Sequence, residues 1–180
     1  KVVYAAAGCA VAEKTKDDPI ATPEDAPISL FHDSPYSISK IIGEMYGNYY
    51  YTQFDLPFVR ARFQNVYGPR EVLGAGQWRG TPATIWRNVV PTFIWRAINN
   101  QPLVLDNEGK SSRDFIYVDD IATGLILCAT QGSPGNAYNL ASGTETMILD
   151  LAKTIVAIAG SESSIELGPP RAWDHSLRRF

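Results

Sequence analysis

The chain of 180 residues is 45% hydrophobic and 19% charged, a composition typical of a folded globular protein with one sizeable core. A net charge of −3 and a pI near 5.4 provide no basic field for nucleic acid. No apolar run has membrane-spanning length, and Cys9 and Cys128 lack metal-ligand spacing. The composition therefore predicts no nucleic-acid partner, no membrane span and no metal, in a reducing, cytoplasmic setting.

The first seven residues have the apolar pattern of a buried strand, and residues 8–33 that of a Pro-containing surface loop. A dinucleotide-binding unit carries Gly-x-Gly-x-x-Gly directly after its first strand. Here the strand is followed by Ala7-Gly8-Cys9-Ala10. The first strand of this sequence is therefore not followed by the Gly-rich loop that binds the phosphates of a dinucleotide.

A helix is predicted over residues 35–53. Ser34 is a favourable N-cap, and Pro35 suits the first turn because its missing N–H would have no partner there. Tyr36 and Lys40 are four residues apart and lie about 40° from each other around the helix axis. The phenol and the ammonium can therefore approach the same point.

The same helix has a glycine side and an apolar side. Gly43 and Gly47 continue the line of Tyr36 and Lys40, so a bulky neighbour can lie close to the backbone there. The opposite side predicts a buried stripe, made of Ile38, Ile41, Ile42, Met45 and Tyr49.

Tyr36 and Lys40 are candidates for acid/base chemistry. A free phenol has a pKa near about 10, so a cation beside it is the simplest means of lowering the pKa of Tyr36. The alternative is an ordinary amphipathic helix whose lysine extends along its surface.

The rest of the chain alternates predicted strands and helices, which indicates an α/β layer architecture. A long Gly-rich, aromatic loop over residues 63–88 is of a length typical of functional loops. Strands are expected at 56–62, 102–105, 113–118, 136–140 and 164–167, and helices at 89–99, 119–129 and 146–159.

Five sequence blocks, in this order, resemble the extended short-chain dehydrogenase/reductase family, in particular its NAD-dependent nucleotide-sugar epimerases and dehydratases. The blocks are SPYSISK at 34–40, RFQNVYGPR at 62–70, RDFIYVDD at 113–120, AYNLASG at 137–143 and RAWD at 171–174. Together they span nearly the whole chain.

The resemblance implies the C-terminal part of a Rossmann-like doubly wound parallel sheet plus a small α/β substrate-binding domain. Residues 1–62 are then the remnant of the NAD-binding domain. Residues 63–180 are mainly the nucleotide-sugar region, with 113–143 partly returning to the Rossmann domain. The chain starts without Met, so we expect it to be part of a longer enzyme and to be inactive alone.

By the same resemblance, Tyr36 is the acid/base and Lys40 its partner, which also binds the nicotinamide ribose of NAD. Phe63 lies near the nicotinamide. A Ser or Thr normally completes this set, and here Cys9 occupies its region. A thiol is a weak hydrogen-bond donor in that role.

The substrate implied is a nucleotide-diphosphate sugar. Asn65 is expected at the diphosphate, although a turn residue is an equally good interpretation, and Asn88 with Val89 is expected at a helix N-terminus that meets the diphosphate or is simply capped. Arg113 would bind phosphate, with a surface pair to Asp114 as the alternative.

Two later residues complete the implied substrate set: Arg171 would bind phosphate and Asp174 a ribose hydroxyl. Asp119 and Asp120 are better explained by a helix N-terminus than by a metal.

The expected function is a 4-epimerase of the UDP-glucose, UDP-galactose or UDP-glucuronate type, because the Asp-Glu pair of the family's dehydratases is not present beside Cys9. The alternatives are a nucleotide-sugar 4,6-dehydratase or 4-keto reductase, and a non-catalytic protein that binds NAD or a nucleotide sugar. A homodimer is expected, because the family pairs through the Tyr36 helix.

Overall fold

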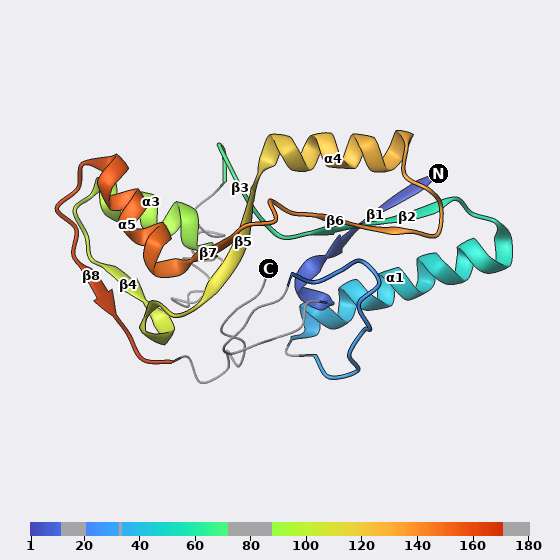
Figure 1. Ribbon diagram of the computed structural model, residues 1–180, viewed down its shortest axis with the longest axis horizontal. Helices are drawn as coiled ribbons and strands as arrows, with labels where there is room; N and C mark the ends of the chain where they lie inside the picture. The colour runs from blue at the N-terminus through green and yellow to red at the C-terminus, as the bar shows by residue number, and fades with distance from the viewer. Residues whose placement is uncertain (12–20, 33, 72–87, 171–180) are drawn as a thin grey trace, which may run out of the picture.

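The computed structural model describes residues 1–11, 21–32, 34–71 and 88–170 (Figure 1). Strands and helices alternate over most of these residues, as the sequence predicts. The elements are β1 (Val2–Ala7), η1 (Gly8–Ala10), α1 (Pro35–Phe54), β2 (Phe58–Phe63), β3 (Asn65–Tyr67), α3 (Val89–Ile98), β4 (Leu103–Leu105), η3 (Asp106–Gly109), β5 (Ser112–Tyr117), α4 (Val118–Thr130), β6 (Ala137–Leu140), β7 (Glu145–Met147), α5 (Ile148–Ala159) and β8 (Ile165–Leu167).

A three-stranded parallel sheet in the order β1-β2-β6 lies between two helices. In Figure 1, α4 lies on one side of this sheet and α1 on the other. The α/β fold with a parallel sheet, predicted from the alternating pattern, is confirmed.

The two faces of β2 differ in character because successive side chains alternate. Val59 and Ala61 are fully buried and pack with Cys128 of α4. The other face meets α1 and carries Phe58 and Arg62, which are also buried. One face of the strand is therefore apolar, and the other places a charge in the interior.

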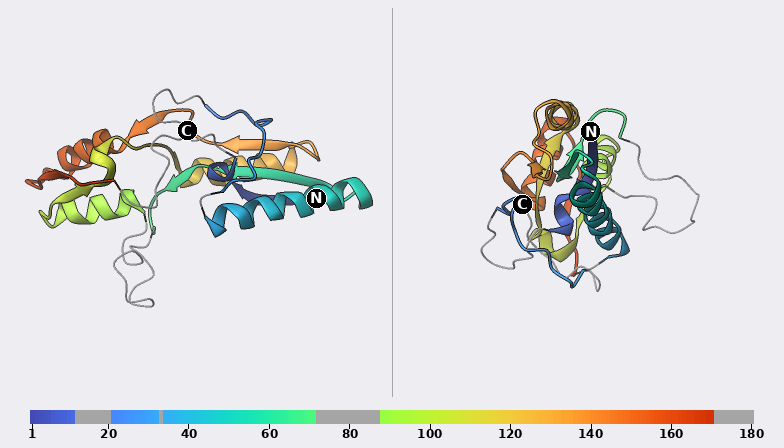
Figure 2. Two further views of the ribbon diagram at one scale, coloured as in Figure 1. Left: turned by 90° about the horizontal axis from the view of Figure 1, so that it is seen from below. Right: turned by 90° about the vertical axis from the view of Figure 1, so that its right-hand side faces the viewer.

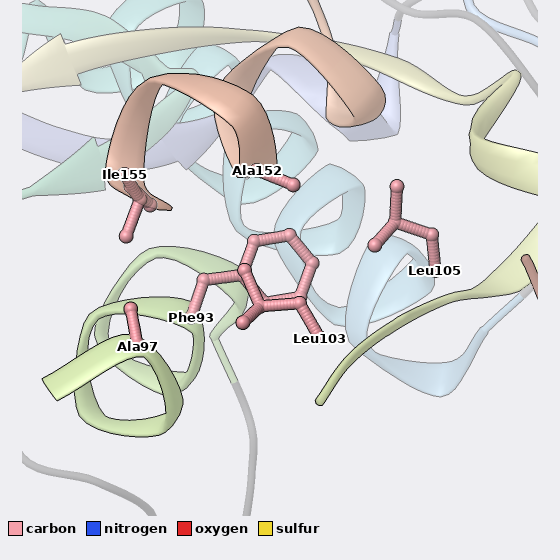
Figure 3. Packing of buried hydrophobic residues seen from close by; sticks show 6 residues of the cluster. All are labelled: Phe93, Ala97, Leu103, Leu105, Ala152 and Ile155. Carbon is pink, nitrogen blue, oxygen red and sulfur yellow. The ribbon is translucent and has the colours of Figure 1, made fainter. Parts of the chain in front are cut away.

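A second unit lies at the far end of the long axis of the molecule, where α3 and α5 gather with β4 and β8 (Figures 1 and 2). β4 pairs with β8 in parallel. Figure 3 shows the core between these elements, which consists of Phe93, Ala97, Leu103, Leu105, Ala152 and Ile155.

A third sheet, in the order β3-β5-β7, connects the two units. Two of its strands are not in the sequence prediction: β3 lies within the long loop expected after Phe63, and β7 includes Thr146 and Met147, for which the sequence predicts a helix. That helix begins at Ile148 instead. The assignment was wrong because a three-residue strand depends on its distant pairing partner more than on local pattern.

The stripe predicted to be buried on α1 is mostly exposed. Of its five residues only Ile41 is buried, because α1 packs on the sheet through its glycine side. The other four, Ile38, Ile42, Met45 and Tyr49, are 45–61% exposed. Among the described residues, no helix is long and apolar enough to cross a membrane.

Candidate active site

The start of α1 follows the predicted capping pattern. The Ser34 side chain accepts a hydrogen bond from Ser37 N at 3.2 Å, and Pro35 occupies the first turn. Tyr36 follows directly and is 55% exposed, so its phenol is accessible to a ligand.

Lys40 reaches from α1 toward the end of β1. Its Nζ donates to Ala5 O at 2.8 Å and lies 5.7 Å from the ring centroids of both Tyr36 and Tyr4. The predicted approach of the tyrosine and the lysine is therefore observed, with the ammonium over the ring.

The pKa of Tyr36 is raised above its ordinary value, first by burial and then by the neighbouring Cys9 and Tyr4. The lowering of this pKa expected from Lys40 is not observed, because burial, Cys9 and Tyr4 all raise it. The protonated phenol can donate a proton, whereas the phenolate is the form that accepts one from a hydroxyl.

The turn after β1 places a thiol within electrostatic range of the phenol. η1 contains Gly8, Cys9 and Ala10, and Cys9 is close enough to influence the pKa of Tyr36. A Cβ at Gly8 would lie 2.3 Å from Gln64 Nε2, so the backbone of η1 and the Gln64 side chain are in close contact. The sequence reasoning did not identify Gln64, which follows the last residue of β2.

Asn65 and Arg113 lie on neighbouring strands, since β3 pairs with β5. Asn65 Nδ2 donates to Asp114 O at 2.9 Å, so this side chain supports the strand that carries Arg113. Asp114 is buried and accepts from Ser142 N, Ser142 Oγ and Gly143 N at 2.8–2.9 Å. Asp114 thus fixes the turn after β6.

Arg113 is half-buried and donates to Ser112 O at 2.6 Å.

The remaining predicted residues are more dispersed. Asn88 is the N-cap residue of α3, but its side-chain amide donates to Glu71 Oε1 instead of capping the helix. Val89 begins that helix, and Phe63 ends β2 next to Leu140. Arg171 and Asp174 lie outside the described residues.

The sequence analysis did not identify a buried ion pair near the site. Glu44, one turn after Lys40, is 1% exposed and pairs with Arg62, which is 2% exposed. Two arginines, Arg60 and Arg62, on a strand expected to be buried were the available signal, because a buried guanidinium requires an acidic partner.

No group of three His, Cys, Asp or Glu side chains with the geometry of metal ligands occurs in the described parts of the chain. The chemistry that these residues offer is proton transfer by a phenol beside an ammonium, at the carboxyl ends of parallel strands. Open α/β sheets bind ligands at that edge.

The chain is similar to known proteins in sequence and in fold. The Bordetella bronchiseptica enzyme WbmF, solved in complex with NAD+, is 55% identical and has a TM-score of 0.78, covering 96% of this chain and 48% of its own. A UDP-glucose 4-epimerase of Mycolicibacterium smegmatis is 30% identical over 179 residues, which are 99% of this chain and 52% of the relative.

A third relative catalyses a different reaction. The dTDP-D-glucose 4,6-dehydratase of Dictyostelium discoideum is 32% identical over 126 residues, which are 70% of this chain and 26% of the relative. The chain thus spans about half or less of the length of these proteins.

Residues 1–141 match the NAD dependent epimerase/dehydratase family. The predicted cofactor, NAD, is the cofactor of this family, and WbmF is solved with it. The chain therefore belongs to the NAD-dependent epimerase/dehydratase family, as the resemblance predicted.

Proposed function

We propose that the protein containing this chain is a nucleotide-sugar 4-epimerase that acts on a UDP-sugar of the glucose, galactose or glucuronate type. The observation that carries this proposal is the Tyr36–Lys40 pair beside η1. The three residues of η1, Gly8–Ala10, include no carboxylate, whereas elimination of water from a sugar needs additional acid/base groups. Transient oxidation at C4 requires only one such group.

In this proposal Tyr36 exchanges a proton with the C4 hydroxyl of the sugar, and Lys40 holds the tyrosine and the nicotinamide ribose. An exposed phenol and an ammonium with three N–H groups, one of them directed at Ala5 O, fit that end of NAD. When bound, NAD supplies the acceptor for the C4 hydride. Phe63, at the end of β2, would lie near the nicotinamide.

The nucleotide diphosphate would bind along the same edge. Asn65 and Arg113 are supported by their neighbouring strands, and a guanidinium suits a phosphate oxygen pair. The crystal structure of WbmF in complex with NAD+ and UDP supports a uridine nucleotide as the nucleotide part of the substrate. Asn88, Val89, Arg171 and Asp174 complete the proposed substrate set.

The whole protein is proposed to be a cytoplasmic homodimer in which residues 1–62 belong to the NAD-binding domain. Residues 63–180 are mainly the substrate region, with 113–143 partly returning. We expect the 180-residue chain alone to have no turnover.

The second candidate is a nucleotide-sugar 4,6-dehydratase or 4-keto reductase. It is favoured by the Dictyostelium discoideum dehydratase, which is 32% identical to the chain. A non-catalytic protein that binds NAD or a nucleotide sugar is the third, because Cys9 stands where the family usually has a hydroxyl.

Proton NMR of the complete protein with UDP-glucose, UDP-galactose and UDP-glucuronate separates these candidates. A C4 epimer is the expected product, and a 4-keto-6-deoxy product would identify a dehydratase. We expect Tyr36→Phe to lower turnover at least about a hundredfold, because it removes the oxygen that accepts the C4 hydroxyl proton during oxidation and returns it afterwards. Near-normal activity of that variant would exclude Tyr36 as the acid/base.

A further inference from the structure

A buried ion pair connects the Tyr36 helix to the parallel sheet. Arg62 Nε and Nη2, on β2, donate to the two carboxylate oxygens of Glu44 at 2.9 and 2.8 Å. Both side chains are nearly inaccessible to solvent. A bidentate pair fixes geometry as well as charge. Arg60 Nη1 also lies 3.8 Å from Glu44 Oε2, so Glu44 is the acid shared by two arginines. Loss of Glu44 would leave the Arg62 charge in the interior without this partner.

The third donor of Arg62 reaches a different segment. Its Nη1 donates to Glu24 O at 2.8 Å, in the loop that precedes α1. The Glu24 carboxylate accepts from Asn139 N at 3.1 Å, and Asn139 Nδ2 donates to Thr22 O at 2.7 Å. The loop is therefore held by both β2 and β6.

These five residues, Thr22, Glu24, Glu44, Arg62 and Asn139, are called the clamp below. Arg62 and Asn139 are register partners, and each is the last residue but one of its strand. The clamp thus lies at the carboxyl edge of the sheet, where open α/β folds bind ligands.

The clamp holds the chain on both sides of Tyr36. Thr22 and Glu24 precede α1, whereas Glu44 lies two turns after Tyr36 within the helix. Tyr36 lies in the first turn of the helix and is 55% exposed, so its position depends on how the two flanking segments are fixed.

We propose that the clamp positions Tyr36, and that Glu24, Arg62 and Asn139 are positioning residues for the proton transfer. The structural part of this inference concerns the start of α1, and its effect on turnover rests on the function proposed above. A misplacement of about 1 Å at a reacting group can cost about a hundredfold in rate.

The test is Glu24→Ala in the complete protein, because Glu24 is exposed and its truncation leaves no cavity in the core. We expect amide hydrogen exchange over residues 21–32 and 34–42 to become about tenfold faster, as for the loss of one hydrogen bond to a charged group. Turnover should fall about tenfold, with the KM for the nucleotide sugar within about twofold.

Two further variants and one control sharpen the result. Glu24→Gln should restore slow exchange and turnover, since its amide oxygen still accepts from Asn139 N. Asn139→Ala keeps the backbone donor to Glu24 but removes the side-chain hydrogen bond to Thr22 O. It should therefore also give faster exchange and lower turnover. Asp25→Ala changes the neighbouring exposed acid and should behave like the unaltered protein.

Equal exchange in the Glu24→Ala and Asp25→Ala proteins would overturn the proposal. Faster exchange of the loop with no change over residues 34–42 would overturn it as well, since the start of α1 would then be independent of the clamp. Hydrogen exchange is measured without substrate, so it tests the clamp independently of turnover. If the unaltered protein shows no turnover, the proposed function is contradicted, and the exchange rates still decide the role of the clamp.

Discussion

Lys40 contacts both a backbone carbonyl and an aromatic ring, with Nζ 2.8 Å from Ala5 O and 5.7 Å from the centroid of the Tyr36 ring. Burial already raises the pKa of Tyr36, so removing the cation makes the phenolate still less stable. We predict that Lys40→Met lowers turnover about a hundredfold at pH 7 and moves the acidic limb of the pH–rate profile to higher pH. The measurement is the turnover rate as a function of pH, with Lys153→Met, at an exposed lysine, as the control. A pH–rate profile of Lys40→Met that is not shifted would contradict the prediction.

At the scale of elements, α1 meets the sheet through close backbone approach. A Cβ at Gly47 would lie 1.8 Å from Phe58 Cζ. We predict that Gly47→Ala lowers the free energy of unfolding by about 1–3 kcal/mol through overpacking, although alanine favours a helix by about 1 kcal/mol over glycine. Urea unfolding measures this, and Gln53→Ala on the exposed end of α1 serves as control. Adding Phe58→Leu should recover part of the loss; a strictly additive double variant would refute the contact.

The limits of α1 were predictable because its signals are local. Ser34 and Pro35 mark the start, and Asp55, in a left-handed conformation, follows the last residue. β3 and β7 were not predictable in the same way, since three residues of strand pattern depend on partners far along the chain.

In the candidate site too, the features that depend on local sequence were predictable and those that depend on distant packing were not. Tyr36 and Lys40 are one helical turn apart, so their approach follows from sequence spacing alone. The Glu44–Arg62 pair requires knowing that β2 packs on α1, and Glu24 joins it only through the folded loop.

At the scale of the whole molecule, α1 presents an apolar outer face opposite the sheet. This outer face is defined by the exposed residues Ile38, Ile42, Met45 and Tyr49. Apolar side chains gathered on one helix face favour burial against a partner, and a second copy would place two such helices together. A stable interface of this kind buries about 1,200–2,000 Å² in total.

We therefore predict that the complete protein is a dimer and that Met45→Glu converts it to a monomer, because a carboxylate at the centre of the outer face would be desolvated without a partner. Light scattering coupled to size exclusion at micromolar concentration measures the mass, which should halve. Ile158→Glu, on the exposed side of α5, is the matched control and should leave the mass unchanged. If the unaltered protein already has the mass of one chain, or if Met45→Glu keeps the mass of two, the outer face of α1 is not the dimer interface.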